Sequence, residues 1–143
     1  MPCRAFDVDV DGKVFESSWV IVTNASRYGG SFTLTRDTCL GAGQLVAVIV
    51  EAQSRATLLG TSLSLALGRL ADPRTRPGYV RAVPANRVVI GRQVATRVEV
   101  DGDEGGMSPV DVSAHGPVVQ LIVPPRYVAD VTNRHTNHVD LRL

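Results

Sequence analysis

The apolar run at 44–52, QLVAVIVEA, is the feature that most constrains the fold of this 143-residue chain. Its apolar residues are continuous rather than alternating, and most of them are valine or isoleucine, which favour strands. A strand that is apolar at every position offers no face to water, so we expect it to be covered on both faces.

Shorter extended runs surround this strand in the sequence. Residues 6–11 alternate apolar and acidic residues, a turn follows at Asp11-Gly12, and 14–23 resumes as a second run. Further runs with turn residues between them lie at 79–83, 87–90, 94–100, 110–113 and 118–123. Many short strands with one helix predict a mainly β fold, an antiparallel two-layer β-sandwich with a helix at one edge. We expect one domain over 1–129 and an irregular tail over 130–143.

One segment, 53–70, changes from the spacing of strands to that of a helix. Its apolar residues recur every three or four positions, Ser54 is placed to cap the N-terminus, and Asp72-Pro73 stops the helix. We expect the stripe to face the core. It consists of Leu58, Leu59, Ser62, Leu63, Ala66, Leu67 and Leu70. A helix that binds a partner or a membrane is the alternative.

Composition excludes several classes of function. The net charge of +1 gives no reason to expect a nucleic-acid partner. Cys3 and Cys39 form no metal-binding pair; reduced thiols are the default, with a disulfide as the alternative. The three histidines are too scattered for a zinc site. The chain has no signal-peptide pattern and no apolar segment long enough to span a membrane, so we expect a cytoplasmic protein.

Two acidic stretches end in Asp-Gly, and the first resembles the start of a calcium loop. Asp7, Asp9, Asp11 and Gly12 match the opening of an EF-hand, but its twelfth position, where glutamate should close the site, is Ser18. No helix is expected on either side. The alternation instead predicts a strand whose carboxylates face solvent.

The second stretch, VEVDGDEGGMSP at 98–109, places Asp101, Asp103 and Glu104 within four residues of a Gly-rich turn. Solvated turn carboxylates are the ordinary interpretation, and a general base or a metal ligand is the alternative. The loop SRYGGS at 26–31 has glycines that could bind phosphate, yet it opens no helix and no lysine follows. We therefore expect a flexible turn, with a phosphate-binding loop as the alternative.

Taken in order, these motifs resemble the C-terminal half of the diacylglycerol kinase-like lipid kinases, which include sphingosine and ceramide kinases. The resemblance covers about residues 6–125. It includes VDVDGK, then Asn24 with Gly29 and Gly30, then LGAGQLVAVIV with Gly43 and Leu45. It ends with VEVDGDEGGMSP and the closing LIVPP.

The resemblance implies a β-sandwich that packs against an N-terminal nucleotide-binding domain, with the active site between them. Such enzymes transfer the γ-phosphoryl group of ATP, with magnesium, to a lipid hydroxyl. The general base of the family is the glutamate of D-G-E, which corresponds to Asp103 here, after Asp101 and Gly102. The loop of Asn24, Gly29 and Gly30 is implied to lie near this turn.

The chain departs from the family in three ways. Asp103 is one methylene shorter than glutamate, so Glu104 is an alternative base. The aspartate of the family's structural magnesium site is Ala42, with the carbonyls of Cys39 and Gln44 beside it; we expect this site to be lost. The G-G-D-G-T nucleotide loop is absent, so we expect this chain alone to have no kinase activity.

The resemblance to lipid kinases implies several partners, and two other interpretations of the chain remain as alternatives. It implies a lipid substrate, an absent nucleotide-binding domain as partner, and peripheral contact with a membrane. The alternative function is a non-catalytic binding or dimerisation module derived from the same fold. An unrelated sandwich that shares only hairpin turns is the third interpretation.

Overall fold

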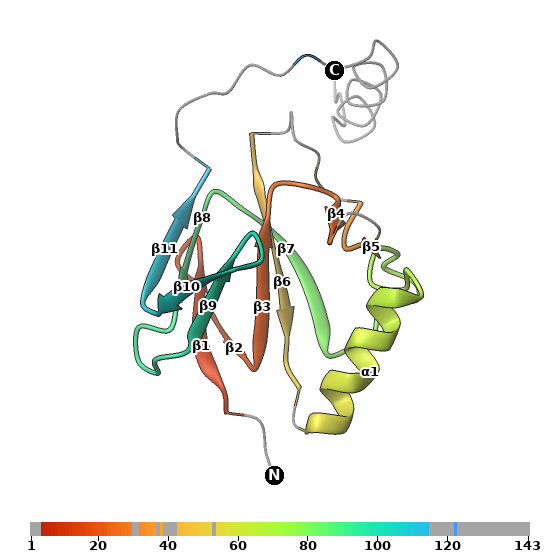
Figure 1. Cartoon of the computed structure of the whole chain (residues 1–143), viewed down its shortest axis with the longest axis horizontal. Helices are drawn as coiled ribbons and strands as arrows, with labels where there is room; N and C mark the ends of the chain where they lie inside the picture. Colours follow the sequence, from red (N-terminus) through yellow and green to blue (C-terminus); the bar gives the residue numbers. More distant parts are fainter. Residues whose placement is uncertain are drawn as a thin grey trace, which may run out of the picture.

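A computed structural model describes residues 4–29, 32–36, 38, 43–52, 54–114 and 122. Within them the chain forms short antiparallel strands and one helix, arranged as two packed sheets with the helix on one side (Figure 1). The mainly β sandwich expected from the sequence is confirmed. The expected tail at 130–143 lies outside the described residues, as does the strand at 118–123 except for Ile122.

Two sheets make up the sandwich, and two hairpins stand beside it. The first sheet has the order β11 (Val110–Ser113), β8 (Arg87–Ile90), β1 (Phe6–Val10) and β2 (Lys13–Ser17). The second has the order β3 (Trp19–Thr23), β6 (Leu45–Val50) and β7 (Val80–Ala85). The small hairpins are β4 (Arg27–Tyr28) with β5 (Phe32–Thr33), and β9 (Arg97–Val100) with β10 (Asp103–Met107).

The central strand β6 is buried at every residue, as its sequence predicts. Its side chains alternate between two cores because successive residues of a strand point to opposite faces. Leu45, Ala47 and Ile49 pack with β1 and β8 in the core between the two sheets. Val46, Val48 and Val50 pack with Leu65 of the helix and with other residues in a second core. The domain therefore has three layers, sheet, sheet and helix.

The predicted strand at 14–23 is broken at Ser18, and its halves belong to different sheets. The Ser18 amide donates to the Val50 carbonyl (2.9 Å), and its hydroxyl donates to the same carbonyl (3.0 Å) while accepting from the Ala52 amide (2.9 Å). Ser17 supports this corner with a hydroxyl bond to the Trp19 carbonyl (2.8 Å). The two serines thus let the chain pass from one sheet to the other with its backbone groups hydrogen-bonded.

The helix α1 (Arg55–Ala66) is capped as predicted, because the Ser54 hydroxyl accepts from the Thr57 amide (3.2 Å). It ends earlier than expected, ahead of Asp72-Pro73. Gly68 has a φ of +69°, which suits a helix C-terminus, and its amide donates to the Leu65 carbonyl (2.9 Å). Leu70 lies beyond the helix and is still buried in the second core.

The expectation that the whole apolar stripe faces the core is wrong. The buried residues of α1 are Thr61 and Leu65, whereas Leu59, Leu63 and Leu67 are 72%, 62% and 57% exposed. The helix also packs on a face of the β3–β6–β7 sheet rather than at its edge. Among the described residues, no helix is long and apolar enough to cross a bilayer.

Candidate active site

The second acidic stretch forms the tip of the β9–β10 hairpin. Asp101 and Gly102 are the two turn residues, with φ values of 54° and 97°, the signature of a type I′ turn. Asp11 and Gly12 make the same turn between β1 and β2, with φ values of 49° and 90°. The two Asp-Gly motifs are therefore equivalent as turns, and any difference in role comes from their neighbours.

The carboxylates at the β9–β10 tip face solvent. Asp101, Asp103 and Glu104 are all exposed, and their side chains have no protein partner within the described part of the chain. Free carboxylates at the end of a projecting hairpin are available to a ligand or a substrate.

The two candidate bases lie on opposite faces of the hairpin. Asp103 is directly across from Val100, while Glu104 is directly across from Glu99. Opposed residues of a hairpin share a face and successive residues alternate. The Asp103 carboxylate is thus beside an apolar side chain, and the Glu104 carboxylate is beside another negative charge.

Gly105 keeps the Asp103 face open. A methyl group at Gly105 would lie 2.9 Å from a methyl of Val100 and 3.2 Å from a methyl of Val98. Because Gly105 has no side chain, both valines remain accessible next to the carboxylate. The face therefore combines one free acid with a small apolar surface.

The base of the hairpin is held by Ser108. Its hydroxyl accepts from the Thr96 amide (2.8 Å), and its own amide donates to the Thr96 carbonyl (2.9 Å). The same hydroxyl lies 3.4 Å from the carbonyl oxygen of Gly91, whose φ of +65° places it close against Ser108. These contacts fix where the hairpin leaves the sandwich.

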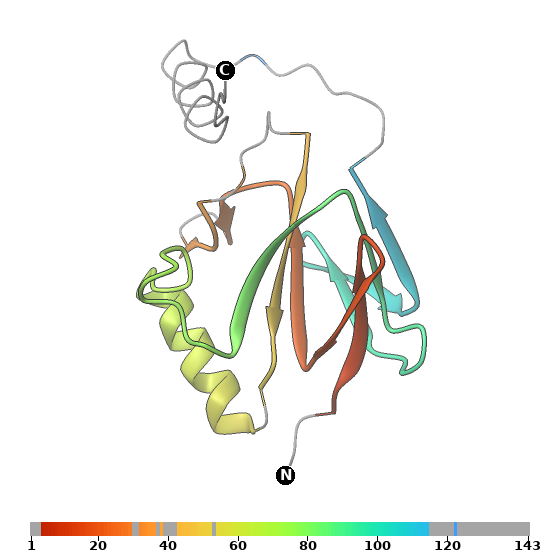
Figure 2. The same cartoon turned by 180° about the vertical axis from the view of Figure 1, so that it is seen from behind.

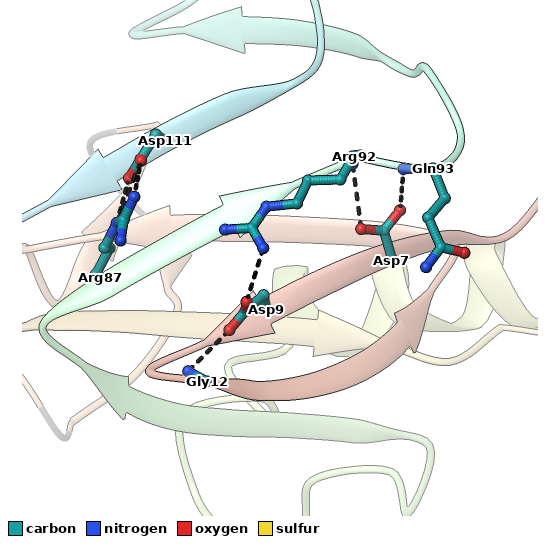
Figure 3. Close-up of polar contacts among 7 residues, drawn as sticks. All are labelled: Asp7, Asp9, Gly12, Arg87, Arg92, Gln93 and Asp111. Atoms are coloured by element: carbon teal, nitrogen blue, oxygen red, sulfur yellow. Dashed lines mark hydrogen bonds and ion pairs between the residues drawn. The ribbon is translucent and has the colours of Figure 1, made fainter.

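The aspartates of the first acidic stretch are anchors, contrary to the expected solvated face. Asp7 accepts from the amides of Arg92 (3.1 Å) and Gln93 (2.9 Å), which begin the loop leading into β9 (Figure 3). Burial raises the pKa of Asp7, but the bonds from Gln93 and Arg92 outweigh it and hold the pKa below its usual value.

Asp9 and Asp11 hold the neighbouring turns. Asp9 accepts from the Gly12 amide (2.8 Å) and pairs with the Arg92 guanidinium (3.3 Å), as Figure 3 shows. Asp11 accepts from the amides of Asn86 (3.0 Å) and Arg87 (2.9 Å), where the chain passes from β7 to β8. All three carboxylates therefore accept hydrogen bonds from backbone amides.

A surface ion pair links β8 to the outer strand β11. The Arg87 guanidinium donates to both carboxylate oxygens of Asp111 (Figure 3). This bond lowers the pKa of Asp111 and raises that of Arg87. Both side chains are exposed, so the pair mainly orients the strand after the hairpin.

The loop that follows β3 lies toward the same end of the domain as the acidic turn (Figures 1 and 2). Asn24 is exposed and its carbonyl lies 3.4 Å from the Thr38 hydroxyl, while Gly29 has a φ of +55°. Gly30 lies outside the described residues. No hydrogen bond joins the described part of this loop to Asp101, Asp103 or Glu104.

The position of the family's structural magnesium is only partly described, because Cys39 and Ala42 lie outside the described residues. The carbonyl of Gln44, an implied ligand, accepts a hydrogen bond from the Thr38 hydroxyl (3.2 Å). Among the described residues, no three His, Cys, Asp or Glu side chains gather as a metal site. The expected loss of the magnesium site therefore stays a prediction, based on the alanine at position 42 of the sequence.

An open hollow of about 640 Å³ lies away from these residues, along β2 and the end of β6. Its lining mixes charged and apolar side chains and includes none of the predicted site residues: Ala5, Lys13, Val14, Phe15, Glu16, Ser17, Ser18, Glu51, Ala52 and Arg81. This hollow and the acidic hairpin are therefore separate features.

Residues 2–123 match the model of the YegS C-terminal NAD kinase beta sandwich-like domain. The chain belongs to this family. No curated protein sequence matches it. Two solved structures of putative diacylglycerol kinases from Bacillus anthracis str. Sterne resemble this YegS C-terminal domain, with TM-scores of 0.60 and identities of 18% and 17%. Each likeness covers 79% of this chain and 38% or 36% of the kinase, so the chain spans just over a third of those proteins.

The resemblance to the diacylglycerol kinase-like proteins, inferred from ordered motifs, is confirmed at the level of family and fold. Sequence reasoning missed the residues that support the hairpin, namely Asp7, Gly91 and Ser108. Asp7 gave no signal beyond strand alternation, and the supporting contacts join residues far apart in sequence. A glycine at the end of a predicted strand was the available hint for Gly91.

Proposed function

We propose that this YegS C-terminal domain is part of an ATP-dependent lipid kinase that phosphorylates the hydroxyl of a diacylglycerol-like lipid. The observation that carries the proposal is the Asp103 carboxylate, which is exposed and unpaired within the described residues and lies across from Val100 on a projecting hairpin. The structural relatives titled as diacylglycerol kinases supply the reaction class.

In this mechanism Asp103 is the general base. The lipid hydroxyl oxygen forms a bond to the γ-phosphorus of ATP, the bond to the bridging oxygen breaks, and ADP leaves. The Asp103 carboxylate accepts the hydroxyl proton. Phosphoryl transfer depends mostly on positioning and on charge stabilisation. The one acid–base group that the protein must provide is a carboxylate positioned to accept the proton of the lipid hydroxyl.

The nucleotide is supplied by the N-terminal domain of the complete protein, and magnesium neutralises the phosphate charge when bound. The residues of this chain orient the acceptor. Val98 and Val100 offer apolar contact to the lipid next to its hydroxyl, on the face that Gly105 leaves open. The loop of Asn24, Gly29 and Gly30 is proposed to border the active site between this domain and the nucleotide-binding domain.

Asp103 is preferred over Glu104 because of the hairpin faces. An acceptor hydroxyl that contacts Asp103 and Val100 cannot contact Glu104, which projects from the other face beside Glu99. The shorter aspartate reaches less far than the glutamate of the family, so the acceptor is expected to sit closer to the hairpin backbone.

The test uses the complete protein with ATP, magnesium and diacylglycerol in detergent micelles. Asp103→Asn is expected to lower kcat by about 10²- to 10⁴-fold, the usual contribution of a general base. Glu104→Gln is the matched control and is expected to change kcat by less than about threefold. The reverse result would assign the base to Glu104, and undiminished activity in both variants would refute a carboxylate base on this hairpin.

Absence of turnover with every lipid tried would refute the kinase proposal itself. The chain would then act as a non-catalytic module of the same fold. For either result, thermal unfolding of the Asp103→Asn variant shows that the domain remains folded, which is expected because Asp103 has no partner to lose within the described residues.

A further inference from the structure

The helix α1 exposes a row of leucines that its contacts with the sheet do not use. Leu59, Leu63 and Leu67 follow one another at intervals of four residues, so they lie on one side of the helix. They are 72%, 62% and 57% exposed. Ala56 and Ala66 lie beside them and are exposed too, and we call these five residues the outer face of α1.

The outer face cannot turn inward, because the opposite side of α1 is fixed. Thr61 and Leu65 are buried and Leu58 packs against the second core. The Thr61 hydroxyl also donates to the Thr57 carbonyl (2.9 Å) within the helix. In Figures 1 and 2, α1 forms one side of the molecule, and no described strand covers its outer side.

The charges around the outer face are positive. Arg55 precedes Leu59 by four residues and so lies in the same row, while Arg69 follows Leu67. Both arginines are exposed, as is Arg74 in the next loop. The helix contains no acidic residue, and the nearby Asp72 accepts from the Arg74 amide (2.9 Å).

We propose that the outer face of α1 docks on the surface of an anionic lipid bilayer. A helix that lies in a bilayer interface buries apolar side chains among the acyl chains and keeps arginines at the level of the headgroups. The leucine row with Arg55 at one end and Arg69 at the other has this arrangement. The proposal deepens the proposed function, on which it rests, because a lipid kinase must reach its substrate at a bilayer.

A second copy of the chain fits this face less well. Two outer faces that packed together would share leucines but would bring arginines from both helices to the contact, with no acidic residue on either helix to balance them. Like charges at an interface oppose association. A row of leucine side chains that stands out from a helix also needs a matching groove on a protein partner, whereas fluid lipid adapts to it.

Co-sedimentation of the chain with vesicles tests the proposal. We expect binding to phosphatidylcholine vesicles that contain phosphatidylglycerol, and much weaker binding to phosphatidylcholine alone. The triple variant Leu59→Gln, Leu63→Gln, Leu67→Gln is expected to lower the apparent partition coefficient by at least about tenfold. Arg55→Gln and Arg69→Gln are each expected to lower it by about fivefold, as is added salt.

The matched control is Val14→Gln, which replaces an apolar residue that is 64% exposed on β2, away from α1. Its binding should stay within about twofold of the wild type. Equal binding by the triple variant, or no binding by the wild type, would overturn the proposal. A wild-type dimer that the triple variant converts to a monomer would also overturn it, in favour of a second copy.

Failure of this proposal is distinguishable from failure of the proposed function. Vesicle binding requires no ATP, so a chain that binds while the complete protein shows no turnover would refute the kinase and leave docking in place. Turnover on diacylglycerol in micelles with no vesicle binding would refute docking and leave the kinase in place.

Discussion

Asp7 connects the first strand to the loop that leads into the acidic hairpin. Its carboxylate accepts from two successive backbone amides, those of Arg92 and Gln93, across more than eighty residues of sequence. Those amides lie just beyond β8, where the chain has left the sheet. Without Asp7 they would depend on water for their hydrogen bonds, and the loop would lose a fixed starting point.

Replacing this carboxylate should lower the stability of the domain. Asp7→Asn keeps one acceptor oxygen but places an NH₂ group toward the second amide, so we expect a loss of about 1 kcal/mol in the free energy of unfolding at pH 7. Urea denaturation followed by circular dichroism measures it. Asp103→Asn is the control, with an expected change below about 0.5 kcal/mol because that side chain has no partner within the described residues.

The effect of Asp7→Asn should depend on pH with a definite sign. The backbone bonds lower the pKa of Asp7 in the folded state. Its stabilisation is therefore complete above the ordinary aspartate pKa of about 3.9 and is lost as the pH falls through the lowered folded value. Wild type and variant should converge in stability below about pH 4. A difference that persisted unchanged into stronger acid would contradict this assignment.

Residue types and their alternation predict where the strands lie, but they do not predict what the acidic side chains on those strands bind. The sequence at 6–11 correctly predicts a strand and an Asp-Gly turn, but Asp7, Asp9 and Asp11 accept from amides far along the chain rather than facing water. Such partners meet only after folding. Asp103 was singled out by family resemblance, and its role in catalysis stays a proposal.

The β9–β10 hairpin depends, as an element, on close packing at its base. Gly91 meets Ser108 there, and a methyl group at Gly91 would overlap the Ser108 hydroxyl and lie 2.9 Å from the Val94 carbonyl oxygen. The positive φ of Gly91 adds a backbone cost for any other residue. The position of the hairpin is therefore sensitive to one small residue outside it.

Gly91→Ala is expected to destabilise the domain by at least about 2 kcal/mol, because it combines overlap with an unfavourable φ. Gly12→Ala separates the two effects. Gly12 has a φ of +90° with no atom within 4 Å of an added methyl, so its cost should be only about 1 kcal/mol. Thermal unfolding measures both, and equal losses would show that the contact with Ser108 is not tight.

Three features of the secondary structure were not predicted from the sequence, and each has a physical reason. The strand β10 has the sequence DEGGM, which is poor in strand-forming residues, and it forms because the Asp101-Gly102 turn brings it against β9. The break at Ser18 depends on the Val50 carbonyl, again far along the chain. In α1 the spacing predicted a helix, but leucines on two sides did not reveal which side packs on the sheet.

At the scale of the whole molecule, the two cores share the strand β6. Odd-numbered residues of this strand face one core and even-numbered residues the other. The cores should therefore unfold together. Trp19, the single tryptophan of the chain, packs against the second core, whereas Val8 is fully buried in the first.

Because both cores share β6, we expect Val8→Ala in the first core to shift the unfolding transition that is measured by the fluorescence of Trp19 in the second core. The loss of two buried methyl groups should cost about 2 kcal/mol, and the midpoint of denaturation should fall equally in Trp19 fluorescence and in far-UV circular dichroism. Leu63→Ala is the control, with little effect on stability because Leu63 is exposed. Separate transitions for the two signals would mean that the cores are independent units.

The sheets also have outer strands, and their composition decides how folded copies can pair through their backbones. The outer strands β2, β7 and β11 carry charged residues or proline, with Lys13 and Glu16 in β2, Arg81 and Pro84 in β7, and Asp111 in β11. Such residues oppose pairing with a foreign strand. Among the described residues, the fourth outer strand is β3, which has the sequence WVIVT and carries neither a charged residue nor proline. Of the outer strands that the structure describes, β3 is therefore the one at which ordered aggregation of the folded domain is expected to begin.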